Sequence, residues 1–377
     1  MMSTRRVGIV MDELKYMIWL THMYGTNLQY IDSLIDKFGS ASAIYNEVGE
    51  PLKKANIMPQ MALSKIIDLK KKLNPDELLY DMLKKGIRYI PKDSDEYPQK
   101  LKNIANPPFG LFILGRLPSF DKLWVSIVGT RRPSDYGKEV TKRLSKELSE
   151  KGVIIVSGMA DGLDGIANQS ALDGGSPTVA VLGSGVDICY PKVNERLYEN
   201  IQLQGCIISE YPPGINSEKW HFPWRNRIIS GLSQATIVTE AEIKSGTSIT
   251  VNYALEQGRE VLAVPGNITS KRSEGTNKLI KEGAHVAACA MDVLDVLGII
   301  ESENLNNINE EIHNIHNIPL APNEKTVYAL LEDGPMNLDD IIKKSGFEIR
   351  AIMVILTKLE LAGMIRELPG QKYTICT

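Results

Sequence analysis

Short apolar runs rich in Val and Ile recur along the middle of the chain and are separated by stretches long enough for a helix. Runs of this kind, apolar throughout rather than alternating, are typical of a parallel sheet with helices on both faces. We therefore expect a doubly wound α/β domain whose ligand lies at the carboxyl ends of the strands. The expected strands cover residues 124–128, 153–157, 178–182, 206–209, 235–239, 260–264 and 285–287.

The first part of the chain has a helical rather than a strand-like pattern. Leu14, Ile18 and Leu20 recur at the spacing of one helix face, and the sequence from Ile31 to Phe38 repeats this spacing before Gly39 ends the helix. These patterns predict a small helical domain over residues 10–85. A scaffold role is favoured for it, and direct contact with DNA or protein stays open.

The end of the chain carries a different mixture of elements. Helix signals over residues 324–332, 337–344 and 348–361 precede two short strands around a turn, which is the pattern of a winged helix. The third helix carries only two cations, Arg350 and Lys358, so a protein-contact or structural role stays open beside DNA recognition. The Asn- and Glu-rich residues 301–318 are typical of a linker, so the expected domains cover residues 10–85, 86–300 and 319–377.

Composition limits the function classes. The chain is 43% hydrophobic and 24% charged, which fits folded domains, and its longest apolar runs have strand length, too short for a membrane span. Without a signal-peptide core, we expect a cytoplasmic protein. Four cysteines without C-x-x-C spacing argue against a zinc ribbon or a disulfide framework. The net charge of −3 does not decide for or against nucleic acid, because cations can cluster on one face.

The turns after the strands carry the candidate chemistry. Residues 127–137 read IVGTRRPSDYG and residues 238–250 read VTEAEIKSGTSIT, so glycine, hydroxyl and cationic side chains come just before a helix. A helix N-terminus offers unpaired N–H groups and a positive dipole end to an anion. We expect several such turns to form one phosphate-binding rim. Its candidate residues are Gly129, Arg131, Arg132, Lys244, Ser245, Gly246, Thr247 and, further along, Lys271.

A second cationic group follows three aromatic residues. Arg225, Asn226 and Arg227 come directly after Trp220, Phe222 and Trp224. Aromatic rings beside arginines suit single-stranded nucleic acid, where rings stack on bases and guanidinium groups contact phosphates. The alternative stays open that these rings pack against the sheet and that Asn226 and Arg227 are buried residues shaping the loop.

Catalytic motifs are missing from these turns. Gly183 and Gly185 begin a dinucleotide fingerprint, but its last glycine is replaced by Ile188, and neither a P-loop nor a G-x-S-x-G elbow is present. A protein that binds without catalysis is therefore the first hypothesis. A hydrolase acting on a nucleoside phosphate, with Glu240 and Glu242 as acid and base, is the second. A scaffold that recruits proteins through its terminal domains is the third.

Several motifs follow one another in a fixed order, most densely over residues 86–290: GTRRPSDYG, SGMADGLDG, AVLGSGVDICYP, SEYPPG, FPWRNRIISG, EAEIKSGTSIT, ALEQGREVLAVPG and EGTNKLIKEGA. This order of motifs resembles the DNA-processing protein A family, also called DprA or Smf. It implies an extended Rossmann-like domain between a sterile-alpha-motif-like helical domain and a winged helix. It also implies a homodimeric, non-enzymatic, cofactor-free mediator of natural transformation that protects single-stranded DNA and loads the RecA recombinase.

The resemblance also implies which residues line the DNA pocket. By position these are Arg131, Arg225, Arg227, Ser245, Gly246 and Thr247, with Lys271 as a weaker candidate. Two positions depart from the family pattern. Asp161 stands where a basic residue is usual, and Asn168 stands where a histidine is frequent, so the local contacts there are expected to differ.

Overall fold

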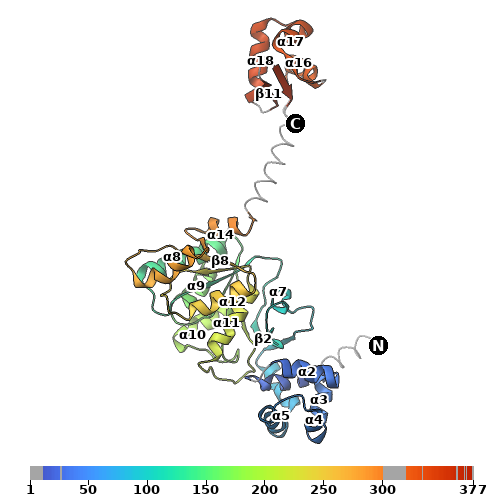
Figure 1. Ribbon diagram of the computed structural model, residues 1–377, viewed down its shortest axis with the longest axis vertical. Coiled ribbons are helices and arrows are strands. Elements are labelled where there is room, and N and C mark those ends of the chain that lie inside the picture. The colour runs from blue at the N-terminus through green and yellow to red at the C-terminus, as the bar shows by residue number, and fades with distance from the viewer. Residues whose placement is uncertain are drawn as a thin grey trace. The chain divides into compact units, whose positions relative to one another are not determined.

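The computed structural model describes residues 12–25, 28–299, 320–332, 334–361, 364–368, 370 and 372–375. The chain divides after Leu297 into two compact units (Figure 1). The expected boundary at residue 85 falls inside the first unit, between a helical segment and the first strand. The expected linker over residues 301–318 lies outside the described residues.

A mostly parallel nine-stranded sheet is the centre of the first unit. Its strand order is β1-β2-β6-β5-β4-β3-β7-β8-β9, and the seven strands from β6 to β9 in this order are parallel, as the Val- and Ile-rich runs predicted. The antiparallel strands β1 and β2 extend one edge. The strands are β1 Arg88–Pro91, β2 Gly110–Gly115, β3 Trp124–Val128, β4 Ile154–Ser157, β5 Thr178–Val181, β6 Cys206–Ser209, β7 Ala235–Val238, β8 Glu260–Ala263 and β9 His285–Val286.

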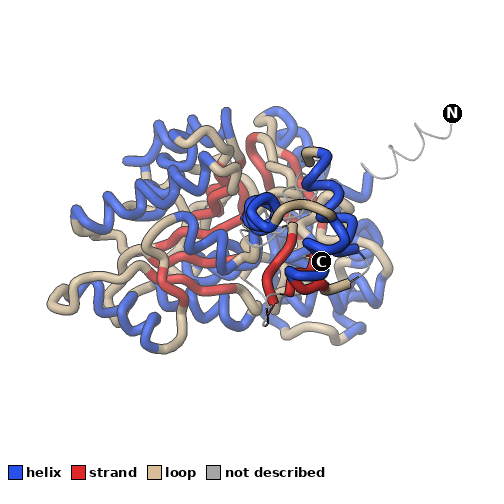
Figure 2. Tube along the Cα trace, turned by 90° about the horizontal axis from the view of Figure 1, so that it is seen from above, coloured by secondary structure: helices blue, strands red, loops and turns tan. Residues whose placement is uncertain are grey.

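Neighbouring residues of each strand point to opposite faces of the sheet. Both faces carry buried apolar side chains, and helices cover both. Val179 and Val181 of β5 belong to the core that includes Ile228 and Val251. Ala180, between them, belongs to the core that includes Ile201. The strands accordingly run between helices on either side in Figure 2. The helices are α7 Gln99–Lys102, α8 Asp135–Glu150, α9 Leu163–Asp173, α10 Glu195–Gln204, α11 His221–Leu232, α12 Thr247–Glu256, α13 Glu274–Lys281 and α14 Ala290–Val296, with short 3-10 turns η2 Lys192–Asn194 and η3 Lys271–Ser273.

The direction of the chain through the sheet reverses beside β3. From β3 the chain adds β4, β5 and β6 on one side, and it then returns to place β7 and β8 on the other side. At such a switch point the loops after the two central strands turn away from each other and leave a crevice, which is the usual ligand site of doubly wound sheets. The doubly wound fold predicted from the apolar pattern is therefore confirmed.

The N-terminal helices pack around their own apolar core, which includes Trp19, Leu34, Ile44 and Ile66. The first helix covers residues 12–20. The others are η1 Thr21–Met23, α2 Leu28–Phe38, α3 Ala41–Glu47, α4 Glu50–Ala55, α5 Gln60–Lys72 and α6 Pro75–Lys84. Ion pairs join these helices to the sheet region, Lys92 with Asp32 at 2.9 Å and Lys85 with Asp187 at 2.6 Å. These helices form one edge of the first unit.

The second unit has the expected winged-helix pattern. Its elements are α16 Pro322–Glu332, β10 Met336–Asn337, α17 Leu338–Ser345, α18 Ile349–Leu361, β11 Ile365–Leu368 and β12 Lys372–Ile375. The three strands form a small sheet in the order β10-β12-β11, and the core includes Val327, Ile341, Ile352 and Tyr373. Asn337 caps α17 by accepting a hydrogen bond from the Asp340 N–H at 2.8 Å. The predicted winged helix is confirmed.

Candidate functional site

A cavity of about 750 Å³ opens at the switch point of the sheet. Its walls are formed by the segments that follow β3, β4, β5 and β7, by one side of α11 and by the first turn of α12. The structure brings together nine of the eleven binding residues expected from the sequence. These are Gly129, Arg131, Arg132, Arg225, Asn226, Lys244, Ser245, Gly246 and Thr247.

The turn after β3 is held rigidly by a buried carboxylate. Glu240 accepts hydrogen bonds from the Ser134 N–H at 2.8 Å and from the Ser134 hydroxyl at 2.5 Å. Ser134 in turn accepts from the Gly137 N–H at 3.0 Å and caps α8. At Gly129 an added Cβ would lie 2.5 Å from Leu163 Cδ1, so glycine is needed there for packing. Glu240 therefore orders the turn, and it does not line the cavity with Glu242 as an acid–base pair would.

Arg131 and Arg132 are both exposed on this turn. The Arg131 guanidinium lies over the ring of Phe222, with Cζ 5.3 Å from the ring centroid, and the Tyr190 ring lies 5.6 Å from the same ring. A guanidinium against an aromatic face keeps its outer edge free for a phosphate. Lys219 also lines the cavity and was not among the expected residues. Its position just before the aromatic group is the signal that could have identified it.

Arg225 lies at the base of the cavity and is only 3% exposed. Its guanidinium donates hydrogen bonds to the carbonyl oxygens of Gly158, at 2.9 Å, and Val181. Burial lowers the pKa of Arg225 to about 10, against the opposing effect of Asp164, so the group stays charged at neutral pH. Burial also raises the pKa of the Asp164 carboxyl, although Arg225 and the N–H groups of Gly129 and Gly158 favour its ionised form. Arg225 and Asp164 thus form the floor of the cavity beneath the exposed cations.

The turn after β7 leads directly into α12. Gly246 precedes this helix, and no side chain of the turn caps its N-terminus. A Cβ placed on Gly246 would meet nothing within 4 Å, and the Ser245 hydroxyl has no hydrogen-bond partner among the described residues. The Lys244 side chain is exposed beside them. An uncapped helix N-terminus with an open approach and a lysine is a favourable place for a phosphate.

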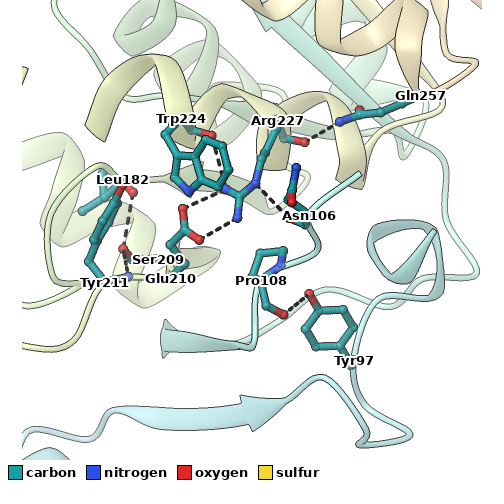
Figure 3. Close-up of polar contacts among 10 residues, drawn as sticks. All are labelled: Tyr97, Asn106, Pro108, Leu182, Ser209, Glu210, Tyr211, Trp224, Arg227 and Gln257. Carbon is teal, nitrogen blue, oxygen red and sulfur yellow. Dashed lines mark hydrogen bonds and ion pairs between the residues drawn. The ribbon is translucent and has the colours of Figure 1, made fainter. Parts of the chain in front are cut away.

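Arg227 is not brought to this cavity, although two of its neighbours are. Its side chain is 1% exposed and forms a bidentate ion pair with Glu210, at 2.8 and 2.6 Å (Figure 3). It also donates to the Asn106 carbonyl at 3.0 Å and lies over the Trp224 ring, with Cζ 4.3 Å from the centroid. All of these contacts are internal, so Arg227 is a buried residue, as the alternative that the sequence left open expected, but it lies within helix α11 and not in a loop. Lys271, in η3, is exposed but does not line the cavity.

The two positions that depart from the family pattern have different surroundings. Asp161 is exposed and accepts a hydrogen bond from the Gly162 N–H at 2.9 Å. Asn168 is fully buried and donates to the Thr178 hydroxyl at 2.8 Å. Asn168 is thus part of the packing between α9 and β5, away from the cavity.

The charge around the cavity favours an anion. Its lining includes Arg131, Arg132, Lys219, Arg225 and Lys244 against two carboxylates, those of Asp164 and Glu242.

Within the described residues, no group of His, Cys, Asp and Glu side chains could hold a metal ion. No helix in the part of the chain that the structure describes is long and apolar enough to cross a membrane.

Comparison with known proteins gives consistent matches. A family model described as DNA recombination-mediator protein A matches residues 88–298, and one described as DprA winged helix domain matches residues 317–371. Protein Smf of Synechocystis sp. is 35% identical over 341 residues, which cover 82% of this chain and 86% of that protein. DNA processing protein DprA of Bacillus subtilis is 44% identical over 209 residues, 55% of this chain and 70% of that protein.

Two solved structures are also similar. The X-ray structure of DNA processing protein A from Streptococcus pneumoniae has a TM-score of 0.65 and 34% identity, covering 74% of this chain and 97% of that one. A structure of DNA processing protein A from Helicobacter pylori has a TM-score of 0.51 and 30% identity, covering 56% of this chain and 95% of that one. The Helicobacter pylori structure concerns the single-stranded DNA binding mode of that protein.

Proposed function

Because the chain belongs to the DNA recombination-mediator protein A family, called DprA or Smf in its relatives, we propose that it binds single-stranded DNA in the cavity at the switch point of its sheet. The observation that carries this proposal is the convergence of four exposed cations on one cavity beside an open helix N-terminus. These cations are Arg131, Arg132, Lys219 and Lys244. Phosphate contacts of this kind position a strand without reading its sequence.

The aromatic wall of the cavity favours a single strand over a duplex. Phe222 and Tyr190 stand beside the cations, and unpaired bases can stack on such rings regardless of sequence. In a duplex the base faces are already stacked on one another. The combination of phosphate contacts with a stacking surface therefore fits an unpaired strand.

Fluorescence anisotropy of a labelled oligo-dT, with equal-length duplex and a mononucleotide as competitors, tests the proposal at two salt concentrations. We expect binding to the single strand to weaken with salt by roughly 0.7 log units of affinity per phosphate contacted for each tenfold rise in salt. Binding of the mononucleotide with no preference for the strand would contradict it.

Charge reversal at Arg131 tests the site. Arg131→Glu should weaken oligo-dT binding about ten- to a hundredfold, because it removes a charge-assisted phosphate contact worth roughly 1.5–3 kcal/mol. Arg116→Glu is the matched control, since Arg116 is also exposed but follows β2, at the opposite end of the parallel strands. Normal binding by a folded Arg131→Glu variant would exclude this cavity.

We further propose that the bound strand is protected and passed to a RecA-type recombinase, and that the protein acts as a homodimer. The description of the matching family as a recombination mediator supports this step. Recombinase assembly on a strand already covered by single-strand-binding protein should be faster when this protein is present. The Arg131→Glu variant should not accelerate recombinase assembly. Sedimentation of the unaltered protein would measure its mass in solution and so test the homodimer.

The alternative function, hydrolysis of a nucleoside phosphate, would have to use Glu242. Glu242 lines the cavity, whereas Glu240 is hydrogen-bonded to Ser134 beneath the turn. Turnover of a mononucleotide that is lost in Glu242→Gln would favour this alternative over a binding protein.

A further inference from the structure

A second cavity of about 380 Å³ lies between the N-terminal helices and α11. Its volume is at the low end of the range usual for small-molecule sites, roughly 300–1,000 Å³. We call it the aromatic chamber, because half of the residues that line it have aromatic rings. These are Tyr24, Phe109, Tyr211, Trp220, Trp224 and Tyr253.

The rings of the aromatic chamber hold each other at fixed angles. Tyr24 and Trp220 both lie edge-on to Tyr211, with centroid distances of 5.9 and 6.3 Å. Tyr211 is stacked on His221, 4.0 Å away, and Arg227 covers one face of Trp224. Trp220 nevertheless remains 42% exposed, which is unusual for so large an apolar side chain in a packed cluster. The chamber thus presents ready-made flat surfaces to a ligand.

The charges around the aromatic chamber do not suit a phosphate. Of the described residues that line it, only Glu210 carries a charge, and that carboxylate is paired with Arg227. Lys65, close by, donates to the Tyr24 carbonyl and lies over the Tyr24 ring, 4.6 Å from its centroid. A flat, uncharged ring fits these surroundings, whereas an anion would meet a carboxylate.

The aromatic chamber adjoins the cavity at the switch point of the sheet, which we call the cationic cavity because Arg131, Arg132, Lys219 and Lys244 line it. Pro223 lines both of them. On α11, Phe222 faces the cationic cavity and Trp224 faces the chamber; on α12, Thr250 lines the first and Tyr253, one turn later, lines the second. A strand held by its phosphates in one cavity would therefore have the other within reach across the first turn of α11.

Building on the function proposed above, we propose that the aromatic chamber receives an unpaired base of the bound single strand. The cationic cavity holds the phosphates, and the chamber holds a neighbouring base against Trp220 and Tyr253. Stacking of this kind tolerates any sequence, because every base has a flat face.

The test compares oligo-dT with an oligomer of the same length in which every base is absent. Trp220→Ala and Tyr253→Ala should each weaken oligo-dT binding about five- to 150-fold, the effect of removing a stacking residue, and leave binding of the abasic oligomer unchanged. Trp220→Phe should restore most of the oligo-dT affinity. Tyr80→Ala, which removes an exposed tyrosine of α6 outside the chamber, is the matched control.

The outcomes separate this inference from the function on which it rests. Failure of the unaltered protein to bind either oligomer would overturn the proposed function itself. Binding that Arg131→Glu weakens for both oligomers, while Trp220→Ala and Tyr253→Ala affect neither or both equally, would overturn the base site alone. If Trp220→Ala does not fold, Tyr253→Ala still decides the question.

Discussion

Arg225 and Arg227 lie two residues apart on α11 and have different surroundings. Arg225 reaches the floor of the cationic cavity beside Asp164, while Arg227 is enclosed with Glu210 and Trp224 (Figure 3). A buried ion pair is weak evidence for stability by itself, but breaking it leaves one charge buried without a partner. Arg227 is therefore expected to matter for the fold rather than for contact with DNA.

Arg227→Met should lower the free energy of unfolding of the first unit by about 3–5 kcal/mol, the usual cost of an unpaired buried charge. Adding Glu210→Leu should recover part of this loss, because the remaining charge is then removed. All four tryptophans lie in the first unit, so their fluorescence during urea unfolding reports this unit alone. Arg116→Met is the control at an exposed arginine. A stable Arg227→Met protein that had lost DNA binding would show that Arg227 contacts the strand.

At the scale of elements, the site is built from turns that pack closely against each other and are joined by hydrogen bonds. The turn after β4 packs on the turn after β3 so closely that a Cβ on Gly162 would lie 2.5 Å from the Thr130 carbonyl oxygen. Glu240, in the turn after β7, holds Ser134 at the start of α8. These contacts fix the turns that carry the cations, which would lower the entropy cost of binding the proposed strand.

The open N-terminus of α12 gives a prediction at this scale. Gly246 has a φ of −60°, which alanine adopts freely, and an added Cβ would have no atom of another described residue within 4 Å, its chain neighbours and its own helix aside. Gly246→Ala should therefore change stability by less than about 1 kcal/mol. If a phosphate approaches this helix end, the methyl group should weaken oligo-dT binding by about tenfold, the loss of one charge-assisted hydrogen bond.

Gly246→Val should weaken binding further, and Ser248→Ala, on the same turn but outside the cavity lining, should have little effect. Anisotropy measures the affinities and tryptophan fluorescence the stability. Equal affinity of all three variants would place the phosphates elsewhere on the rim.

At the scale of the whole molecule, the cationic cavity is formed entirely by residues of the first unit, between Val128 and Thr250. The winged helix has its own core, and its helix α18 exposes the apolar side chains of Ile349, Met353 and Val354. Exposed apolar side chains on the third helix fit the protein-contact role that the sequence left open better than recognition of DNA, which favours cations.

Deletion of residues 319–377 should therefore leave most of the affinity for oligo-dT in place. A second DNA-binding module joined by a linker would raise the overall affinity by roughly a hundredfold or more, so a loss below about tenfold indicates that the first unit binds alone. The same anisotropy titration measures both chains. A hundredfold loss would instead show that the winged helix contributes to binding.

The sequence by itself determined the elements and most of the rim. Val- and Ile-rich runs, helical spacing and glycine-rich turns are local patterns, and they predicted all seven parallel strands and the winged helix. They also predicted that the turns after parallel strands share one edge, which is why seven of the expected residues, those of the turns after β3 and β7, line one cavity. These features follow from periodicity and chain direction, which neighbouring residues already define.

Only the tertiary structure decided which side chains reach the cavity. Arg227 is buried because it pairs with Glu210 and donates to the carbonyl of Asn106, 121 residues earlier in the chain. Glu240 does not line the cavity because it accepts hydrogen bonds from Ser134, 106 residues before it. Lys219 enters the site, and the aromatic chamber forms, because α11 packs against distant segments. The physical reason is that burial and ion pairing depend on neighbours in space, and a local pattern contains no information about them.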